Sequence, residues 1–486
     1  MKKRLLEVFV LSMAAILLSV SCGRKVEFQG YGVSSDVDPL RRVIMLTPGE
    51  DGARQSYWLY ADNPFYVITY DEGAIAQHRG MMDKMRAQRI EVIEIQDLIA
   101  SALRNARAEA KFDSALEEMF PLTFPLLRNY MESLTPDDLL GRTDDINYSY
   151  DEEGRFRPLI EPAFAFYFTR DFAVMTPKGL ILTNAKESWR GVEHRLGRFI
   201  FTYADGLRDC PVLFDAEKEG VFCEGGDILV RDEKTIFMGI HNFSDSAAAE
   251  KIARTLDMDV IGVAMPPYED FSGANIEIMH LDTVFNFVDR DKILTVPYLF
   301  EAAYDGKNPL TDLLGSIEGS LEHLRELKKA ESETGVGEAE GEGKKAREPE
   351  EKTEPEAGMS LAMAVKNIPT VGWLTRYRAG SGEMEELKTK LVDYLREEGY
   401  RVIWVGGDRG EMREDKYIME RVFYELSLQA ANVVQLAPGK VLAYAHNKQT
   451  IRALRDGGVE VVTFEGKYLA DGLGGPHCLT MPMLRK

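Results

Sequence analysis

One pattern recurs along the sequence and restricts the folds that this chain can adopt. It consists of an apolar strand, a tight turn, a second strand, a helix and a third strand, and it is complete over residues 228–263 and 433–464. Parts of the pattern occur at 43–95, 174–179 and 284–292. Units that repeat in this way stack on their neighbours, so a radial or solenoid arrangement is expected. Four or five units that close on themselves would leave a central cavity.

Two segments interrupt the pattern. Residues 101–145 carry apolar side chains at helical spacing and a helix-start signal at Thr135–Asp138, so they are predicted to form a helical insertion. Residues 331–358 are rich in Glu, Lys, Gly and Pro, with almost no large apolar side chain. Such a segment cannot offset its ordering entropy by burial, and a disordered acidic loop is predicted. The remaining ranges would form one α/β domain: 38–100, 146–330 and 359–486.

The N-terminus has the pattern of an export signal. Met1–Arg4 is basic, and the apolar stretch Val8–Val20 is shorter than the ~20 residues that span a bilayer. Residues 1–21 are therefore predicted to be a signal peptide. Cys22 follows small residues, as in a bacterial lipobox, so it is predicted to carry lipid, with residues 22–37 as a tether. The protein would then be exported and anchored to a bacterial membrane, in the periplasm or at the cell surface.

Charge and cysteine content exclude some classes of function. The net charge is −21, whereas phosphate backbones attract Lys and Arg, so nucleic acid is not an expected partner. With Cys22 lipidated, three of the four cysteines remain, and an odd number implies at least one free thiol. The sequence has no CxxC pair and no clustered Cys and His, so a structural zinc site is not expected. No metal or cofactor is implied.

Polar residues that are unusual at strand ends recur once per unit. His280 and Asp282 are two residues apart, so on a strand they share one face. Together with Cys478 and two further carboxylates they would supply a nucleophile and an acid–base partner. Carboxylates beside a thiolate favour a guanidinium or amidinium cation over a peptide bond. The four motifs are Phe168-Thr169-Arg170-Asp171, Glu224-Gly225-Gly226-Asp227, Met279-His280-Leu281-Asp282 and Gly474-Gly475-Pro476-His477-Cys478.

Each motif alone is a weak signal. A Glu-Gly-Gly-Asp segment is often an ordinary turn, and a histidine on a strand is often structural. The glycines before Cys478 could be interpreted as a phosphate loop, but only eight residues follow the cysteine, too few for the βαβ unit that this fingerprint requires. Their recurrence at matching places in repeated units favours the functional interpretation.

Taken together, the motifs resemble those of the arginine deiminases, in the guanidino-group-modifying superfamily with the pentein fold. The resemblance runs from about Asp38 to the C-terminus, apart from 331–358. Besides the motifs above, it rests on Arg42–Gly49 and on Gly474–Pro482. It implies a five-bladed α/β propeller of ββαβ units. Residues 101–145 look like the helical insertion that distinguishes deiminases within the superfamily.

The resemblance implies roles for the residues of these motifs. Cys478 would attack the guanidinium carbon. His280 would protonate the departing ammonia and then activate the water that hydrolyses the thiouronium intermediate. Asp171 and Asp282 would clamp the guanidinium nitrogens, and Glu224 would orient His280.

The positions expected to recognise the amino-acid end of arginine depart from the family pattern. Arg190 is kept, and Phe168 is also expected to contact the substrate. Ala165 stands where the family has Asn, while Phe243 and Leu473 stand where it has Arg. A charged group buried without partners is costly. Free arginine would therefore bind differently, or the substrate would be another guanidine, such as agmatine or a peptidyl arginine.

The expected function is hydrolysis of a linear amidine C–N bond, which converts L-arginine or a related guanidine to citrulline, or another ureido product, and ammonia. An amidinotransferase is disfavoured by the helical insertion. A non-catalytic guanidine-binding lipoprotein is disfavoured because a binder needs no nucleophile. The expected partners are a small guanidino substrate and, through Cys22, a lipid bilayer, and a homo-oligomer is compatible with the sequence.

Overall fold

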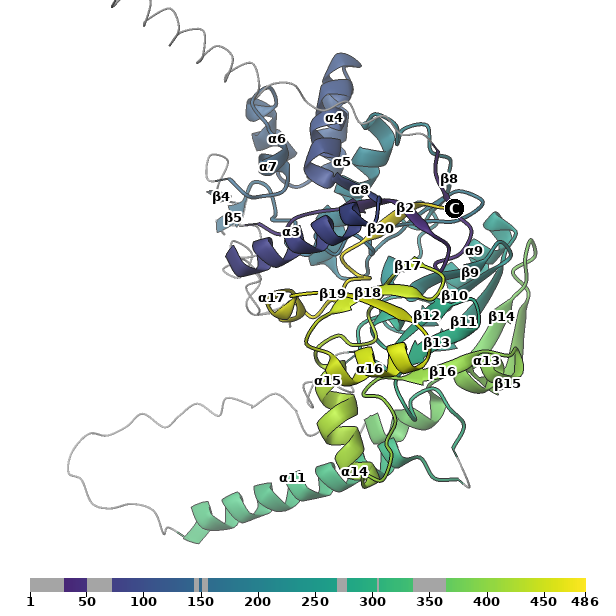
Figure 1. Cartoon of the computed structure of the whole chain (residues 1–486). Coiled ribbons are helices and arrows are strands. Elements are labelled where there is room, and N and C mark those ends of the chain that lie inside the picture. The colour runs from purple at the N-terminus through teal and green to yellow at the C-terminus, as the bar shows by residue number, and fades with distance from the viewer. Residues whose placement is uncertain are drawn as a thin grey trace, which may run out of the picture.

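Five sheets of the protein share one plan, which is the repeat predicted from the sequence (Figure 1). The computed structural model describes residues 30–49, 72–143, 148–150, 156–268, 278–303, 306–334 and 364–486. In each of the five sheets two strands are antiparallel, and a third strand runs parallel to one of them. The protein is therefore an α/β protein, and none of its sheets closes on itself within the described ranges.

Four of the sheets begin with a hairpin of consecutive strands. Their strands are β6 (Ala173–Met175), β7 (Leu180–Leu182) and β8 (Val212–Asp215); β9 (Ile228–Asp232), β10 (Thr235–Ile240) and β11 (Asp259–Ala264); β12 (Phe285–Asp289), β13 (Lys292–Thr295) and β16 (Arg401–Trp404); and β17 (Val434–Ala437), β18 (Lys440–Tyr444) and β19 (Glu460–Phe464). The helices that connect the second and third strands are α8 (Gly191–Tyr203), α9 (Ser246–Leu256), α13 (Leu391–Glu397) and α16 (Lys448–Asp456).

The remaining sheet of this plan joins the two ends of the described chain. C-terminal β20 (Met481–Arg485) lies between β1 (Gly32–Val33), to which it is parallel, and β2 (Leu40–Met45), to which it is antiparallel. Helix α3 (Glu72–Ala87) then leads to β3 (Glu91–Glu94), which is parallel to β2.

Local sequence explains why these elements start and stop where they do. Asp245 caps α9 by accepting a hydrogen bond from the Ala248 amide at 2.7 Å, which satisfies one of the free N–H groups of the first turn. The buried residues Ala248, Ile252 and Leu256 fall at helical spacing and turn one face of α9 to the core. Between β17 and β18, Gly439 has a φ of 67°, which glycine adopts without steric cost.

Neighbouring sheets contact one another through strands, short helices and α9. β20 packs against β6, β12 against β18, and β17 against β2. The short helices η3 (Gly225–Asp227) and η4 (Leu281–Thr283) pack against each other, and α9 packs against β8. Two clusters of buried apolar residues fill the space between the elements.

The predicted helical insertion is helical in the structure but begins earlier. Its helices are α4 (Ile95–Ala108), α5 (Phe112–Met119), α6 (Phe124–Leu127) and α7 (Pro136–Leu139), and Thr135 and Asp138 form a capping box. They lie at the top of Figure 1, opposite α11 (Pro309–Thr334). Two antiparallel strands that the sequence did not indicate, β14 (Trp373–Tyr377) and β15 (Met384–Lys390), extend the sheet of β11. A further two-stranded sheet consists of β4 (Tyr148–Tyr150) and β5 (Phe156–Pro158).

The predicted tether is wrong for residues 30–37. β1 pairs with β20, and Val33, Asp36 and Val37 are buried, because their apolar and hydrogen-bonding groups find partners in the sheets. The predicted signal peptide and Cys22 lie outside the described residues. Of the predicted acidic loop, 331–334 belong to α11 and 335–358 lie outside the described residues.

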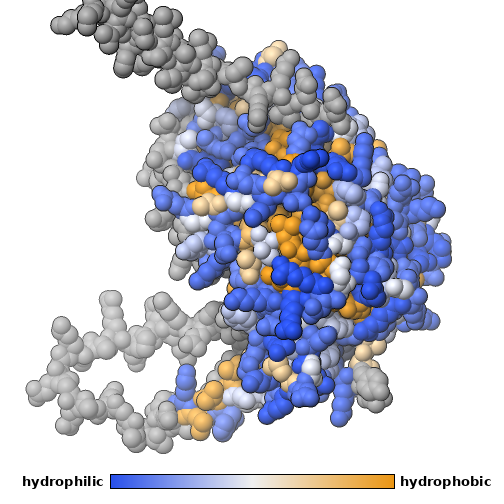
Figure 2. All heavy atoms as spheres, viewed as in Figure 1, coloured by the Kyte–Doolittle hydropathy of each residue, from blue (hydrophilic) through white to orange (hydrophobic). Residues whose placement is uncertain are grey.

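The surface agrees with the acidic composition. Figure 2 shows hydrophilic residues over most of this face, with apolar residues in a band through the middle. Apolar residues also show on α11, where Leu324 and Leu327 are exposed. Among the described residues, no helix has the length and apolar character that a bilayer crossing requires.

Candidate active site

Three of the four polar motifs line one pocket, and the fourth, which contains Glu224, lies directly behind it. The lining includes Phe168, Asp171, Arg190, His280 and Cys478. These residues come from distant parts of the sequence, and each lies at or near the start of a strand or helix. The structure therefore brings the predicted residues together. Glu224 and Asp282 do not line the pocket; they lie behind it, against His280 and Cys478 respectively.

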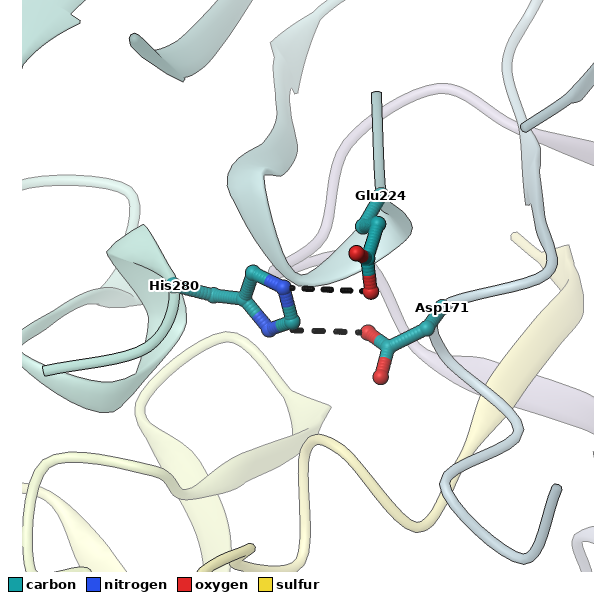
Figure 3. A group of neighbouring side chains, drawn as sticks. All are labelled: Asp171, Glu224 and His280. Atoms are coloured by element: carbon teal, nitrogen blue, oxygen red, sulfur yellow. Dashed lines mark ion pairs between the residues drawn. The ribbon is translucent and has the colours of Figure 1, made fainter. Parts of the chain in front are cut away.

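The ring of His280 faces two carboxylates, those of Glu224 and Asp171 (Figure 3). Its Nε2 is 3.4 Å from Glu224 Oε2, and its Nδ1 is 3.8 Å from Asp171 Oδ1. Burial alone would lower the pKa of His280, but the charge of Asp171 and the hydrogen bond and charge of Glu224 raise it to about 10. The imidazole is therefore protonated at neutral pH and can serve as an acid.

The guanidinium of Arg190 is held on three sides by carboxylates. Nη2 binds Asp171 at 2.9 Å, Nε binds Glu193 at 3.1 Å, and Nη1 binds Glu224. Burial would raise the pKa of Glu224, but the charges of Arg190 and His280 lower it to about 2. Arg190, expected to contact the substrate, thus has all three of its nitrogens engaged within the protein.

The Glu-Gly-Gly-Asp motif needs its glycines because the backbone is crowded. A Cβ on Gly225 would lie 1.9 Å from the Arg170 carbonyl oxygen, and one on Gly226 would lie 2.6 Å from His280 Nδ1. The Gly226 amide also donates to Asp171 Oδ1 at 3.1 Å. The motif therefore sets the positions of both the Asp171 carboxylate and the His280 imidazole.

Asp227, the last residue of that motif, supports His280 indirectly. Its carboxylate accepts hydrogen bonds from the Leu281 amide at 2.9 Å and from Ser244 Oγ at 2.6 Å, and it lies 2.8 Å from His241 Nε2. Since Leu281 follows His280 directly, these contacts fix the backbone that carries the imidazole.

The thiol of Cys478 faces Asp282. Sγ lies 3.5 Å from Oδ2 and 3.8 Å from Oδ1 of this carboxylate. Burial, followed by the charges of Asp282 and Asp171, raises the pKa of Cys478 well above its ordinary value. Burial also raises the pKa of Asp282 to about 7. These surroundings keep the thiol protonated, and a cation bound beside it would favour the thiolate.

Two neighbours of the thiol were given no role from the sequence. Asn432 Nδ2 lies 3.0 Å from Cys478 Sγ, and His477 Nδ1 lies 2.7 Å from Asp282 Oδ2. Asn432 precedes the apolar strand of its repeat, just as Asp171 and Asp227 precede theirs. Alignment of the repeats would have pointed to Asn432, whereas no sequence signal separates His477 from an ordinary loop histidine.

The outer wall of the pocket is mainly apolar. Phe164 and Trp189 stack with ring centroids 5.0 Å apart, and Ala165 and Leu473 also line this wall. Phe243 is absent from the lining and instead packs edge-on against the His280 ring, 5.9 Å between centroids. Among the described lining residues, the cationic side chains are those of Arg190 and the protonated His280.

Fold and site together define an α/β protein with a buried cysteine, a charged histidine and several carboxylates at one pocket. The family model for arginine deiminase matches residues 127–309 and 363–485, which is more than half of the chain. The protein therefore belongs to the arginine deiminase family and is a hydrolase that acts on guanidino C–N bonds.

Individual relatives agree with this assignment. The putative arginine deiminase of Mycoplasma pneumoniae is 23% identical, and the arginine deiminase of Streptococcus uberis is 26% identical; each alignment covers 93% of this chain and 98% of the relative.

Among solved structures, the amidinotransferase SxtG of Microseira wollei aligns with a TM-score of 0.44 and 12% identity, over 94% of this chain and 97% of its own. DDAH from Pseudomonas aeruginosa, in complex with citrulline, aligns with a TM-score of 0.42 and 10% identity, over 91% and 99%.

Proposed function

We propose that the protein hydrolyses L-arginine, or a related guanidino compound, to citrulline, or the corresponding ureido product, and ammonia. The observation that supports this proposal best is the shared pocket of Cys478, His280 and Asp171, with Glu224 and Asp282 directly behind it. This set supplies a nucleophile, a charged acid and anionic partners for a guanidinium. Homology to proteins named arginine deiminase points to the same reaction.

The first half of the reaction forms a covalent intermediate. The guanidinium binds in the pocket beside Asp171, with Asp282 behind Cys478, and its positive charge offsets the carboxylates that keep the Cys478 thiol protonated. The thiol proton passes to Asp282, its nearest carboxylate, and Sγ bonds to the guanidinium carbon. His280 gives its proton to the departing nitrogen, the C–N bond breaks, and ammonia leaves a thiouronium on Cys478.

The second half regenerates the thiol. His280, now neutral, takes a proton from a water molecule as the water oxygen bonds to the same carbon. The C–S bond then breaks, Asp282 returns its proton to Cys478 Sγ, the proton of the new hydroxyl passes to solvent as the carbonyl forms, and the ureido product leaves. Glu224 keeps the imidazole oriented and basic in this step, because its carboxylate raises the pKa of His280.

We also propose that the five sheets are the blades of a closed ring. The contacts of β20 with β6, α9 with β8, η3 with η4, β12 with β18 and β17 with β2 link each of the five sheets to two others. A ring of five blades is the arrangement in which every one of these contacts is made once, and it would place the motifs at a common centre. The pentein propeller accounts for the site in this way.

A second candidate substrate is a guanidine that lacks a free carboxylate. Arg190 is engaged by Asp171, Glu193 and Glu224, and Ala165 and Leu473 offer no charge at the outer wall. A substrate carboxylate would be buried there without a partner unless Arg190 exchanged its own partners. Agmatine and peptidyl arginine avoid this cost.

An ammonia-release assay over L-arginine, agmatine, methylarginines and arginine-containing peptides tests the function and the substrate together. Turnover of L-arginine with citrulline as product supports the first candidate, and turnover of agmatine or peptides alone supports the second. If every guanidine binds without release of ammonia, the protein is a guanidine-binding lipoprotein instead. Transfer of the amidino group to an added amine would identify an amidinotransferase.

Replacement of the nucleophile gives the direct test of the covalent step. Cys478→Ala should lower ammonia release at least about 10³-fold, since no other group in the pocket can form the thiouronium. Cys210→Ala is the matched control, because Cys210 is also buried and free but lies outside the pocket. Mass spectrometry of acid-quenched wild type with substrate should show the adduct on Cys478. Near-normal turnover by Cys478→Ala would exclude the mechanism.

We further propose that Cys22 is lipidated after cleavage of residues 1–21, so that the protein is exported and held at a bacterial membrane. The basic n-region, the short apolar stretch and the small residues before Cys22 support this proposal. In a bacterial host, labelled palmitate should enter the wild type but not Cys22→Ser, and the variant should move to the soluble fraction. Equal labelling of the two proteins would exclude it.

A further inference from the structure

The side chain of Asn432 makes four hydrogen bonds around the nucleophile. Oδ1 accepts from the backbone amides of His477 at 2.9 Å and Cys478 at 3.1 Å. Nδ2 donates to Cys478 Sγ at 3.0 Å and to the Asp282 carbonyl oxygen at 3.2 Å. These bonds use both donors and both acceptor sites of the amide, and the side chain is completely buried.

The contacts fix which end of the amide faces the sulfur. A backbone N–H can only donate, so the atom that faces the His477 and Cys478 amides must be the carbonyl oxygen. The Asp282 carbonyl can only accept, so the atom that faces it must be the nitrogen. The group that faces Cys478 Sγ is therefore an N–H donor, and a flipped amide would break the bonds to the His477 and Cys478 amides and to the Asp282 carbonyl.

We propose that Asn432 is a catalytic residue, whose amide donates a hydrogen bond to Cys478 Sγ and thereby stabilises the thiolate that attacks the guanidinium. This role rests on the proposed function of the site. The same side chain accepts from the consecutive backbone amides of His477 and Cys478 and so sets the direction of Sγ.

The surroundings of the sulfur explain why such a donor is needed. Burial and the charges of Asp282 and Asp171 all raise the pKa of the Cys478 thiol, whereas hydrogen bonds from the Gly475 backbone and from the Asn432 side chain lower it. The Tyr444 phenol interacts electrostatically with Cys478, but its hydroxyl donates its hydrogen bond to the Gly474 carbonyl and not to the sulfur. Asn432 is thus a neutral side-chain donor that opposes two anions, beside the Gly475 backbone. The protonated His280, in the same pocket, also favours the thiolate through its charge.

The contact between Asn432 and the Cys478 loop requires a glycine at position 475. A Cβ on Gly475 would lie 2.5 Å from Asn432 Cβ and 2.6 Å from its Oδ1. Real Cβ atoms do not approach so closely, so any other residue would push the Cys478 loop away from Asn432. The glycine before the nucleophile therefore lets the loop close on the asparagine.

The test compares Asn432 with a second buried asparagine that shares one of its contacts. Asn286 Nδ2 also donates to the Asp282 carbonyl, at 3.0 Å, but has no bond to Sγ. Alkylation of Cys478 by iodoacetamide would be followed over a pH series in Asn432→Asp, Asn432→Ala, Asn286→Asp and Asn286→Ala, and quantified at the Cys478 peptide by mass spectrometry. Asn432→Asp keeps an oxygen for the two backbone amides, and Asn432→Ala removes the donor without adding charge.

Both Asn432 variants should move the alkylation midpoint of Cys478 to higher pH by about one unit or more, and lower the rate at neutral pH about tenfold, the effect of one hydrogen bond to a charged group. The Asn286 variants should keep the wild-type midpoint. A thermal melt of each variant separates loss of fold from loss of the donor. Equal alkylation profiles in folded Asn432 and Asn286 variants would overturn the role of Asn432. Because alkylation needs no substrate, absence of ammonia release from every guanidine would instead overturn the proposed function.

Discussion

At the scale of single residues, His280 shows how buried charges are balanced here. Its imidazole is fully buried, yet Asp171 and Glu224 keep it charged, and Arg190 in turn neutralises those carboxylates. The folded pKa of about 10 lies above the ordinary value of 6.5. The contribution of this proton to stability is therefore fully present below pH 6.5 and is lost as the pH rises through 10.

Titration of labelled histidines by NMR measures this charge directly. In the wild type, the His280 ring should stay protonated from neutral pH to about 10. Glu224→Gln should lower its pKa by about one unit or more, because one adjacent negative charge is lost. Glu193→Gln is the control, since Glu193 binds Arg190 but makes no contact with His280. A wild-type His280 that titrates near 6.5 would contradict this account of the site.

At the scale of elements, the turn η3 positions the site without contributing a reacting atom of its own. Gly225 lies against the Arg170 backbone, and Gly226 lies against the His280 ring. A methyl group at the first position meets rigid backbone, whereas one at the second meets a side chain that can move. A side chain at Gly225 would therefore affect mainly the stability of the protein, and one at Gly226 mainly its activity.

Substitution of each glycine by alanine tests this separation. Gly225→Ala should lower the melting temperature markedly, because the Arg170 carbonyl cannot yield without loss of sheet contacts. Gly226→Ala should fold, but its ammonia release should fall about tenfold or more as the imidazole is displaced from Glu224. Equal effects on melting and turnover in the two variants would show that the turn acts as one structural unit.

At the scale of the whole molecule, the segment before β2 joins two sheets. β1 pairs with β20, while Asp36 exchanges hydrogen bonds with Val230 of β9, each 2.8 Å long. The buried Asp36 carboxylate is also the nearest anion to Arg170, at 3.9 Å from Nη1. Residues 30–37 therefore belong to the folded domain.

Two truncated proteins measure this contribution. A chain that starts at Asp38 should be less stable than one that starts at Gly30 by about 3 kcal/mol or more, from the loss of the buried Val33 and Val37 side chains and the Asp36 hydrogen bonds. Thermal melts monitored by circular dichroism give the comparison. Equal melting temperatures would mean that this segment is a tether after all.

Much of the fold and of the site can be predicted from the sequence because both depend on short-range patterns. The strands expected at 433–436 and 441–444 are found at Val434–Ala437 and Lys440–Tyr444, since two short apolar runs on either side of a glycine turn specify a hairpin locally. The polar motifs recur at the same place in each repeat, so their meeting at one pocket follows once the repeats pack alike.

Only the tertiary structure decided which of these groups touch. Neither the engagement of Arg190 by three carboxylates nor the contact of Asn432 with Cys478, 46 positions apart, follows from any local pattern. Nor did it indicate β14 and β15, which β11 holds in its sheet. Local patterns determine hairpins and helices because their hydrogen bonds are local. The partner of a buried charge or amide depends on chain segments that meet only when the sheets pack.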